Sequence, residues 1–141
     1  MTDEVFFDSN IICYAFDLRE PDKRGVCLEL MKRVLNSEIR GVVSNQVLGE
    51  VFHATVRKFG LPADQAFTII DGMFQSDKWK KVDYTCETID RAARKSGQSR
   101  IQFWDAVILE TMKENGIRKI ITENVRDFAG ISGIEVANPF L

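Results

Sequence analysis

The sequence predicts an α/β fold, a three-layer α/β/α sandwich in which helices cover both faces of a central, mainly parallel five-stranded sheet. Short apolar runs alternate along the chain with longer segments whose apolar residues recur at helical spacing, which is the pattern of a parallel sheet wrapped by helices. The length of 141 residues suits one compact domain with a substantial core, so residues 1–141 are expected to form a single domain.

The N-terminal elements are expected to be one strand and two helices. Residues 4–7 form a short apolar run, and the polar pair after it can cap a helix over about 10–16 by accepting a free backbone N–H. Pro21 suits the first turn of a second helix, whose apolar residues keep helical spacing as far as Leu35.

The middle of the chain gives another strand and two more helices. A glycine and two valines make a short strand at 41–43. The amphipathic pattern over 44–59 predicts a helix that stops before Gly60 and Pro62, because glycine and proline interrupt helical structure. A further helix is expected over 63–74.

The last part of the chain completes the sheet. The least regular strand is expected at 78–82, and a helix after it leads to a polar loop at 95–100. Residues 103–112 form a strongly apolar helix pattern, and strands are expected at 119–121 and 134–136.

The composition excludes several classes of protein. Hydrophobic residues make up 45% and charged residues 28%, which excludes disorder, and the net charge of −2 leaves room only for a local basic patch. Three widely spaced cysteines, Cys13, Cys27 and Cys86, predict reduced core residues and neither a disulfide framework nor a zinc site. With no signal peptide and no stretch near the roughly 20 apolar residues of a membrane-spanning helix, a cytoplasmic protein without a membrane partner is expected.

Three acids interrupt apolar sequence, where an unpaired carboxylate is costly to bury. Asp8 follows the first expected strand, so it is either a helix cap or one of the ligand groups that α/β sheets gather at strand ends. Glu50 lies at the edge of an apolar stripe, where a solvated glutamate is also common. Asp105 lies in a helix that is apolar on nearly every side, so it is expected to be largely buried and functional, although helix capping also explains an acid this near a helix start.

A shared divalent cation explains the three acids together. Carboxylates held within a few ångströms of one another repel and would protonate unless a cation offsets their charge. Mg²⁺ prefers oxygen ligands and keeps several waters, one of which it makes a better nucleophile. Asp8, Glu50 and Asp105 are therefore candidate metal ligands and catalytic residues.

A further polar cluster follows the strand expected at 119–121. Thr122, Glu123, Asn124 and Asp127 bring several oxygen ligands to another strand end. The same residues also suit the start of an ordinary helix with Thr122 as its cap.

Cations and a histidine lie close in sequence to two of the acids. Arg94, Lys95 and Arg100 lead into the helix of the third acid, where they can pair with nucleic-acid phosphates or form a solvated helix face. His53 comes three residues after Glu50 but points away from the apolar stripe, so a surface histidine is expected and not a metal ligand.

Five segments together give the chain a family likeness. They are FFDSNIICYAF, SNQVLGEVFHAT, FWDAVILETMKENG, IITENVRDF and VANPF. In this order and spacing they resemble the PIN domain, especially the VapC-like toxin ribonucleases of toxin–antitoxin pairs, from one end of the chain to the other. The resemblance implies a Mg²⁺- or Mn²⁺-dependent endoribonuclease that cleaves single-stranded RNA, with the metal held by Asp8, Glu50 and Asp105.

The resemblance also assigns supporting residues. Asn10 matches a family asparagine that helps to order the site, and Thr122 matches a common polar residue after the fourth strand. One position departs from a common pattern, because a fourth acid often stands where this chain has Asn124. Asp127, and less directly Glu123, is expected to replace that ligand through a water.

Partners are implied as well: a homodimer, and a small antitoxin protein that places a segment across the active site. Tyr14, Phe16, Leu30 or Val34 on the early helices can serve such contacts, and packing inside the domain explains these residues equally well.

Two other functions stay open. A haloacid-dehalogenase-like phosphatase needs a second aspartate two residues after the first, and this chain has Asn10 there. A PIN-like binding module without turnover is favoured only by Asn124, since all three acids are present.

Overall fold

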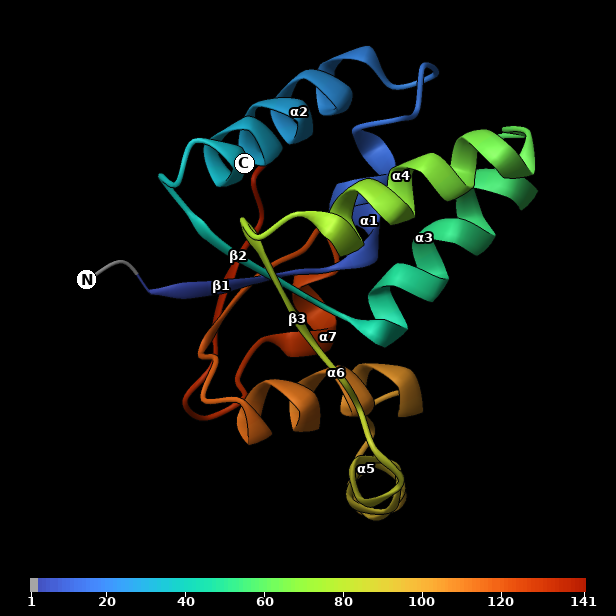
Figure 1. Ribbon diagram of the computed structural model, residues 1–141. Helices are drawn as coiled ribbons and strands as arrows, with labels where there is room; N and C mark the ends of the chain where they lie inside the picture. The colour runs from blue at the N-terminus through green and yellow to red at the C-terminus, as the bar shows by residue number, and fades with distance from the viewer. Residues whose placement is uncertain (1–2) are drawn as a thin grey trace.

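The computed structural model describes residues 3–141 and has the predicted α/β architecture (Figure 1). Its sheet contains five strands in the order β3-β2-β1-β4-β5, and every neighbouring pair is parallel. The strands are β1 (Glu4–Phe7), β2 (Arg40–Ser44), β3 (Trp79–Val82), β4 (Lys119–Ile121) and β5 (Glu135–Ala137).

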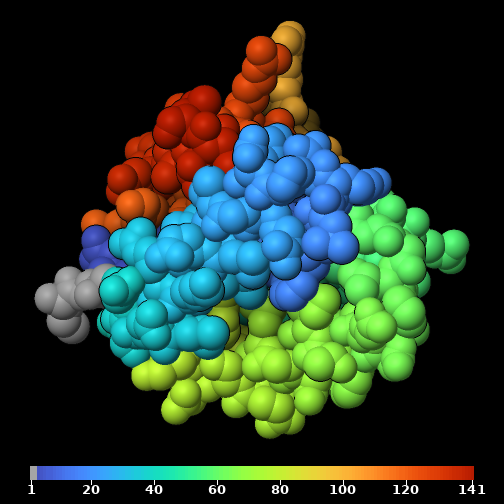
Figure 2. All heavy atoms as spheres, turned by 90° about the horizontal axis from the view of Figure 1, so that it is seen from above, coloured from blue at the N-terminus to red at the C-terminus, as the bar shows by residue number. Residues whose placement is uncertain are grey.

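Helices cover both faces of this sheet. In Figure 1, α1 to α4 lie on one face and α5 to α7 on the other, and the space-filling view from above shows the first face covered by side chains of α2 and α4 (Figure 2). Among the helices of residues 3–141, none combines the length and apolarity that a bilayer crossing requires. The helices are α1 (Ser9–Tyr14), α2 (Pro21–Leu35), α3 (Asn45–Arg57), α4 (Ala63–Gln75), α5 (Cys86–Gln98), α6 (Phe103–Glu114) and α7 (Val125–Phe128).

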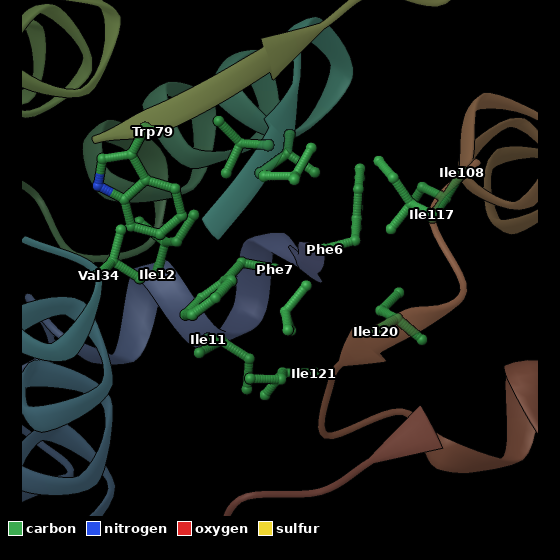
Figure 3. Close-up of a cluster of buried hydrophobic side chains, with 14 of the residues drawn as sticks. Phe6, Phe7, Ile11, Ile12, Val34, Trp79, Ile108, Ile117, Ile120 and Ile121 are labelled. Carbon is green, nitrogen blue, oxygen red and sulfur yellow. The ribbon is translucent and has the colours of Figure 1, made fainter. Parts of the chain in front are cut away.

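The core is built on both faces of the central strand β1. Successive side chains of a strand point to opposite faces, and both Phe6 and Phe7 are fully buried (Figure 3). Both faces of β1 are therefore covered. Phe7 packs edge-on against Trp79 of the edge strand β3, with 4.9 Å between ring centroids. A Cβ atom at Gly41 of β2 would lie 2.7 Å from Cζ3 of Trp79, so the core accepts only glycine there without rearrangement.

The polar loop predicted at 95–100 is wrong, because α5 continues to Gln98. Thr85 and Thr88 form a capping box at the start of α5, and Ala92 packs against α6. Residues 95–98 therefore belong to the helix, and only residues 99–102 form a loop before α6. The other predicted elements agree with the structure to within two residues at each end.

One prediction about burial is wrong, and one open alternative is decided. Cys13 and Cys27 are buried as predicted, but Cys86 is exposed because it occupies the first turn of α5. For Val34 the sequence left partner contact and packing inside the domain equally open, and the side chain is fully buried against the Trp79 side of the core. Val34 therefore has a packing role only.

Candidate active site

The carboxyl ends of β1 and β4 meet where the strand order reverses. The chain places β2 and β3 on one side of β1 and then returns to place β4 and β5 on the other. Ligands of open α/β sheets bind outside the carboxyl ends of the strands at such a reversal. Asp8 directly follows β1 and Thr122 directly follows β4, and the N–H of Asp8 donates to the carbonyl of Ile121 at 3.1 Å. The topology therefore brings these two predicted site residues together.

Asp8 is held in place by hydrogen bonds to both of its carboxylate oxygens. Oδ1 accepts the backbone N–H of Ser9 at 2.8 Å, which makes Asp8 the N-cap of α1. Oδ2 accepts the hydroxyl of Thr122 at 2.7 Å and, more weakly, the amide of Asn10 at 3.4 Å. Asp8 is 5% exposed, so these contacts keep a nearly buried carboxylate in one orientation.

Asn10 and Thr122 connect the loops that follow β1 and β4. The amide of Asn10 donates to Oγ1 of Thr122 at 3.3 Å, and its oxygen accepts the N–H of Glu123 at 3.3 Å. Oγ1 of Thr122 also accepts the N–H of Asn124 at 3.0 Å. These residues therefore have the contacts expected of side chains that order Asp8.

The three acids singled out from the sequence line one cavity of about 340 Å³, hereafter the acid cavity. Asp8 comes from the end of β1, Glu50 from the second turn of α3 and Asp105 from the first turn of α6. Asn10 and Asn124 line the same cavity. Segments far apart in the sequence thus bring three carboxylates to one hollow at the carboxyl edge of the sheet.

Asp105 is less buried than expected. The apolar character of α6 predicted a largely buried acid, but the side chain is only half-buried and the adjacent Trp104 is 43% exposed. The prediction is wrong because the first turn of α6 opens onto the cavity, while full burial begins at Ala106.

Burial and mutual repulsion disfavour the charged form of all three acids. Burial, followed by the charges of Asp127, Asp8 and Glu50, raises the pKa of Asp105 to about 6. Burial is also the main reason that the pKa of Asp8 is raised, although the hydrogen bond from Thr122 opposes it. The pKa of Glu50 is raised by burial and by the charge of Asp8. A bound cation would relieve this strain because it offsets the negative charge.

The donor set fits a divalent metal with a large share of water ligands. Within residues 3–141, Oε1 of Glu50 is buried and has no hydrogen-bond partner, which is costly for a carboxylate unless a cation or water completes it. Carboxylate and amide oxygens are the ligands that Mg²⁺ and Mn²⁺ prefer. In the described part of the chain, no group of three or more acidic, histidine or cysteine side chains is arranged to hold a metal ion by itself. Mg²⁺ does not require one, since one or two carboxylates and several waters hold it in many proteins.

The position of the missing fourth acid remains polar. Asn124 lines the cavity, whereas Asp127 is exposed and acts on the site through its charge, which raises the pKa of Asp8 and Asp105. Glu123 is engaged elsewhere, since it accepts the hydroxyl of Tyr14 at 2.6 Å and pairs with Lys23. Asp127 is therefore better placed than Glu123 to act on the site through a water.

The cations predicted to bind RNA do not line the cavity. Arg94 pairs with Asp90 at 3.0 Å on the exposed face of α5, and Arg100 is exposed in the loop after α5. Lys95 lies beside Lys113, and this contact lowers the pKa of Lys95. Proximity in sequence to α6 therefore did not bring these side chains to the acids.

Sequence reasoning missed a lysine that does line the cavity. Lys58, at the C-terminal end of α3, borders the same hollow as Glu50. Lys58 follows Glu50 by eight residues, about two helical turns, and this spacing could have indicated that both side chains lie on the same face of α3. His53 is exposed as predicted and borders a neighbouring hollow.

Comparisons with known proteins identify relatives of this arrangement. The model of the family described as PIN domain matches residues 5–133. A comparison with curated protein sequences gives no significant match. The solved structures described next have at most 20% sequence identity to this chain. Similarity at this level shows the fold alone.

Three solved structures resemble the chain over nearly all of its length. A toxin–antitoxin complex from Klebsiella pneumoniae has 20% identity and a TM-score of 0.65, covering 96% of this chain and 97% of that one. VapC20 from Mycobacterium tuberculosis, described as a sarcin-ricin loop cleaving toxin, has 20% identity and a TM-score of 0.67, covering 93% and 98%. DNA-bound VapBC from Salmonella typhimurium has 16% identity and a TM-score of 0.65, covering 99% of each chain. Since the family model spans most of its length, this chain belongs to the PIN domain family.

Proposed function

We propose that this protein is a Mg²⁺- or Mn²⁺-dependent endoribonuclease that cleaves single-stranded RNA, and that it is the toxin of a toxin–antitoxin pair. The observation that carries the proposal is the single cavity lined by Asp8, Glu50 and Asp105, which come from three distant parts of the chain. PIN domain proteins are typically nucleases that use a divalent metal. The similarity to VapC20 supports RNA as the substrate, because that protein is described as cleaving the sarcin-ricin loop.

Asp8, Glu50 and Asp105 are the residues that would hold the metal, and Asp127 would act through a water. When bound, the metal supplies a more acidic water and stabilises charge on the phosphate oxygens. Asp8 needs no reorientation to take part, since Ser9 and Thr122 already hold its carboxylate. Preorganised ligands of this kind lower the cost of assembling the reactive arrangement.

The remaining site residues have two roles, which are to attract the substrate and to hold the loops of the site together. Lys58 borders the acid cavity and offers a positive charge to a phosphate that three carboxylates would otherwise repel. Asn10 and Thr122 keep the loops after β1 and β4 together and so maintain the distance between Asp8 and Asn124. No histidine or serine nucleophile is needed for this reaction, because water is the attacking group.

Cleavage of a fluorescent single-stranded RNA tests the proposed activity. We expect cleavage with Mg²⁺ or Mn²⁺, none with EDTA, and loss of activity to that background in Asp8→Asn and in Asp105→Asn. Asp90→Asn, on the exposed face of α5, is the matched control and should cleave normally. Thermal unfolding of each variant shows whether it is folded.

The results separate the competing functions. Unchanged cleavage in both site variants would contradict the proposed mechanism. Hydrolysis of a phosphomonoester without RNA cleavage would favour the phosphatase, although membership of the PIN family and Asn10 both count against it. RNA binding without cleavage under any divalent metal would favour a binding module.

We also propose that the protein forms a homodimer and is blocked by a small antitoxin. Several similar structures are described as toxin–antitoxin or VapBC complexes. The exposed apolar side chains Phe67 and Phe74 are seven residues apart on α4, so they share one face of that helix. Light scattering tests the dimer: the expected mass is twice the 16.1 kDa of the chain, and the mass of a single chain would contradict it.

A further inference from the structure

A second hollow of about 520 Å³ adjoins the acid cavity. Glu50 and Lys58 line both hollows, so the two are continuous along α3. The opposite side of the second hollow carries Tyr84 and Trp104, and Gln46 also lines it. This volume falls within the range that small-molecule and cofactor sites occupy, roughly 300 to 1,000 Å³.

An exposed aromatic pair forms one side of this hollow. Of the two tryptophans in the chain, Trp79 is 3% exposed in the core and Trp104 is 43% exposed. The rings of Trp104 and Tyr84 meet edge-on, with 6.2 Å between centroids and 71° between planes. The ring of Phe103 also meets that of Trp104 edge-on, with 4.9 Å between centroids. The indole is thus supported by two aromatic neighbours and still offers surface to a ligand.

A buried polar group beside the indole lacks a partner. Gln46 is 8% exposed, and its Nε2 donates to the carbonyl of Trp104 at 3.2 Å, which connects α3 to the first turn of α6. Within residues 3–141, Oε1 of Gln46 is buried and accepts no hydrogen bond. An unused buried acceptor is costly, and a ligand N–H would satisfy it.

Affinity for RNA needs a source other than attraction between charges, because the acid cavity is lined by carboxylates. Until a cation offsets their charge, the three carboxylates repel a phosphodiester, and a net charge of −2 gives the chain no general attraction to phosphate. Stacking of bases on aromatic side chains does not depend on charge and is the common way in which proteins hold single-stranded RNA.

We propose that this second hollow is a nucleotide subsite in which one base of single-stranded RNA stacks on Trp104. An N–H on the base edge donates to Oε1 of Gln46, and the adjoining phosphate lies toward Lys58 and the acid cavity. The subsite rests on the proposed function, since it supplies the base next to the scissile bond. Trp104 and Gln46 are binding and positioning residues in this scheme and take no part in the chemical step.

Binding of a short single-stranded RNA to the Asp8→Asn protein tests the subsite without cleavage. Indole fluorescence should change on binding, because Trp104 is exposed whereas Trp79 is buried. Trp104→Ala should weaken RNA binding about 10- to 100-fold, and Trp104→Phe should retain most of the affinity. Phe52→Ala removes an exposed aromatic ring that lines neither hollow and should leave RNA binding unchanged.

A scan of abasic nucleotides through the same RNA assigns the contact to one position. Removing the base beside the scissile bond should weaken RNA binding by the protein that retains Trp104. The same removal should cause no additional loss of RNA affinity in Trp104→Ala, because both changes remove the same contact. Equal affinity of the Trp104 and Trp104→Ala proteins, or an undiminished abasic penalty in Trp104→Ala, would overturn the subsite. Loss of binding to a partner protein in Trp104→Ala with unchanged RNA affinity would assign the hollow to that partner and also overturn it.

Failure of the subsite can be told apart from failure of the proposed function. If the chain is not a nuclease, the protein with native Asp8 cleaves no RNA under any divalent metal, whatever residue stands at position 104. If only the subsite is wrong, Trp104→Ala cleaves with unchanged KM and kcat.

Discussion

At the scale of single residues, Asp8 serves the fold and lines the candidate site at the same time. Its Oδ1 caps α1 through Ser9 and its Oδ2 is held by Thr122, while the carboxylate borders the acid cavity. The two interpretations that the sequence left open for Asp8 are therefore compatible. Hydrogen bonds that fix a ligand oxygen are as useful to a metal site as they are to a helix start.

The three acids, Asn10 and Thr122 were found from the sequence, whereas Lys58 and Trp104 were missed. Asp8, Glu50 and Asp105 stand out because each interrupts an apolar pattern. Lys58 and Trp104 break no pattern, since a lysine at a helix end and an aromatic in an apolar helix are both ordinary. Their place beside the acids depends on how α3 and α6 meet, which is a tertiary property.

Thr122→Val tests the support of Asp8. The change removes the hydroxyl that donates to Oδ2 of Asp8 and keeps the volume of the side chain. We expect Mn²⁺ affinity, measured by titration calorimetry, to fall about 10- to 100-fold, as is usual when a partner of a metal ligand is lost. Thr122→Ser keeps the hydroxyl and should bind Mn²⁺ nearly as the native chain does. Equal affinities of the valine and serine variants would contradict this role.

Metal affinity should depend on pH through Asp105. Its pKa is raised to about 6, and a carboxylate must lose its proton to bind a metal. Mn²⁺ affinity should therefore be low at pH 5, rise through about pH 6 and level off near pH 7. In Asp105→Asn the part of this rise that comes from Asp105 should disappear. A native affinity that is constant from pH 5 to pH 7 would contradict the assignment of Asp105 as a ligand.

At the scale of helices and strands, local patterns predicted the elements well. They failed where a polar, exposed part of a helix was interpreted as a loop. Residues 95–100 were interpreted as a polar loop, but residues 95–98 continue α5, which the capping box at Thr85 and packing of Ala92 on α6 hold in helical form. Periodicity was sufficient for α3, α4 and α6, each of which turns some of its apolar residues toward the core and leaves others exposed, such as Phe67 and Phe74 of α4.

Gly41→Ala tests the packing of β2 against β3 and α2. The new Cβ would lie 2.7 Å from Cζ3 of Trp79 and 2.9 Å from Cγ2 of Val34, both of which belong to the core. We expect the free energy of unfolding in urea to fall by about 1–3 kcal/mol, the usual cost of overpacking a core.

Gly72→Ala is the matched control for this prediction. Gly72 lies inside α4, and an added Cβ there meets no atom within 4 Å. This change should stabilise the protein by about 0.5–1 kcal/mol, since alanine favours the helix. A Gly41→Ala protein as stable as the native chain would show that Trp79 moves aside without cost.

At the scale of the whole molecule, the order of the strands determines where the acids meet. The reversal between β1 and β4 brings Asp8 and Thr122 together, and α3 and α6, one from each face of the sheet, add Glu50 and Asp105. The alternation of strands and helices was enough to predict the parallel sheet. It could not give the direction of Arg94 and Lys95, because the orientation of α5 depends on its packing against α6.

The same arrangement makes stability depend on metal and pH. The pKa of Asp105 is raised to about 6 from 3.8, so the metal-free folded chain binds more protons than the unfolded chain between these values. Its stability should therefore fall as pH rises from about 4 to about 6, with Asp8 and Glu50 acting in the same direction. At pH 7 a divalent metal at about 100 times its Kd should stabilise the fold by about 2.7 kcal/mol. Thermal unfolding with Mn²⁺ and with EDTA measures this, and equal Tm values would contradict it.

The central claim is that Asp8, Glu50 and Asp105 together hold one divalent metal site, and the most direct test is anomalous diffraction from crystals soaked in Mn²⁺ near pH 7. The account predicts a manganese peak in the cavity between these carboxylates, and its absence from crystals of Asp105→Asn. A protein that cleaves RNA with Mn²⁺ in solution, but whose crystals show manganese only away from this cavity, would contradict the account.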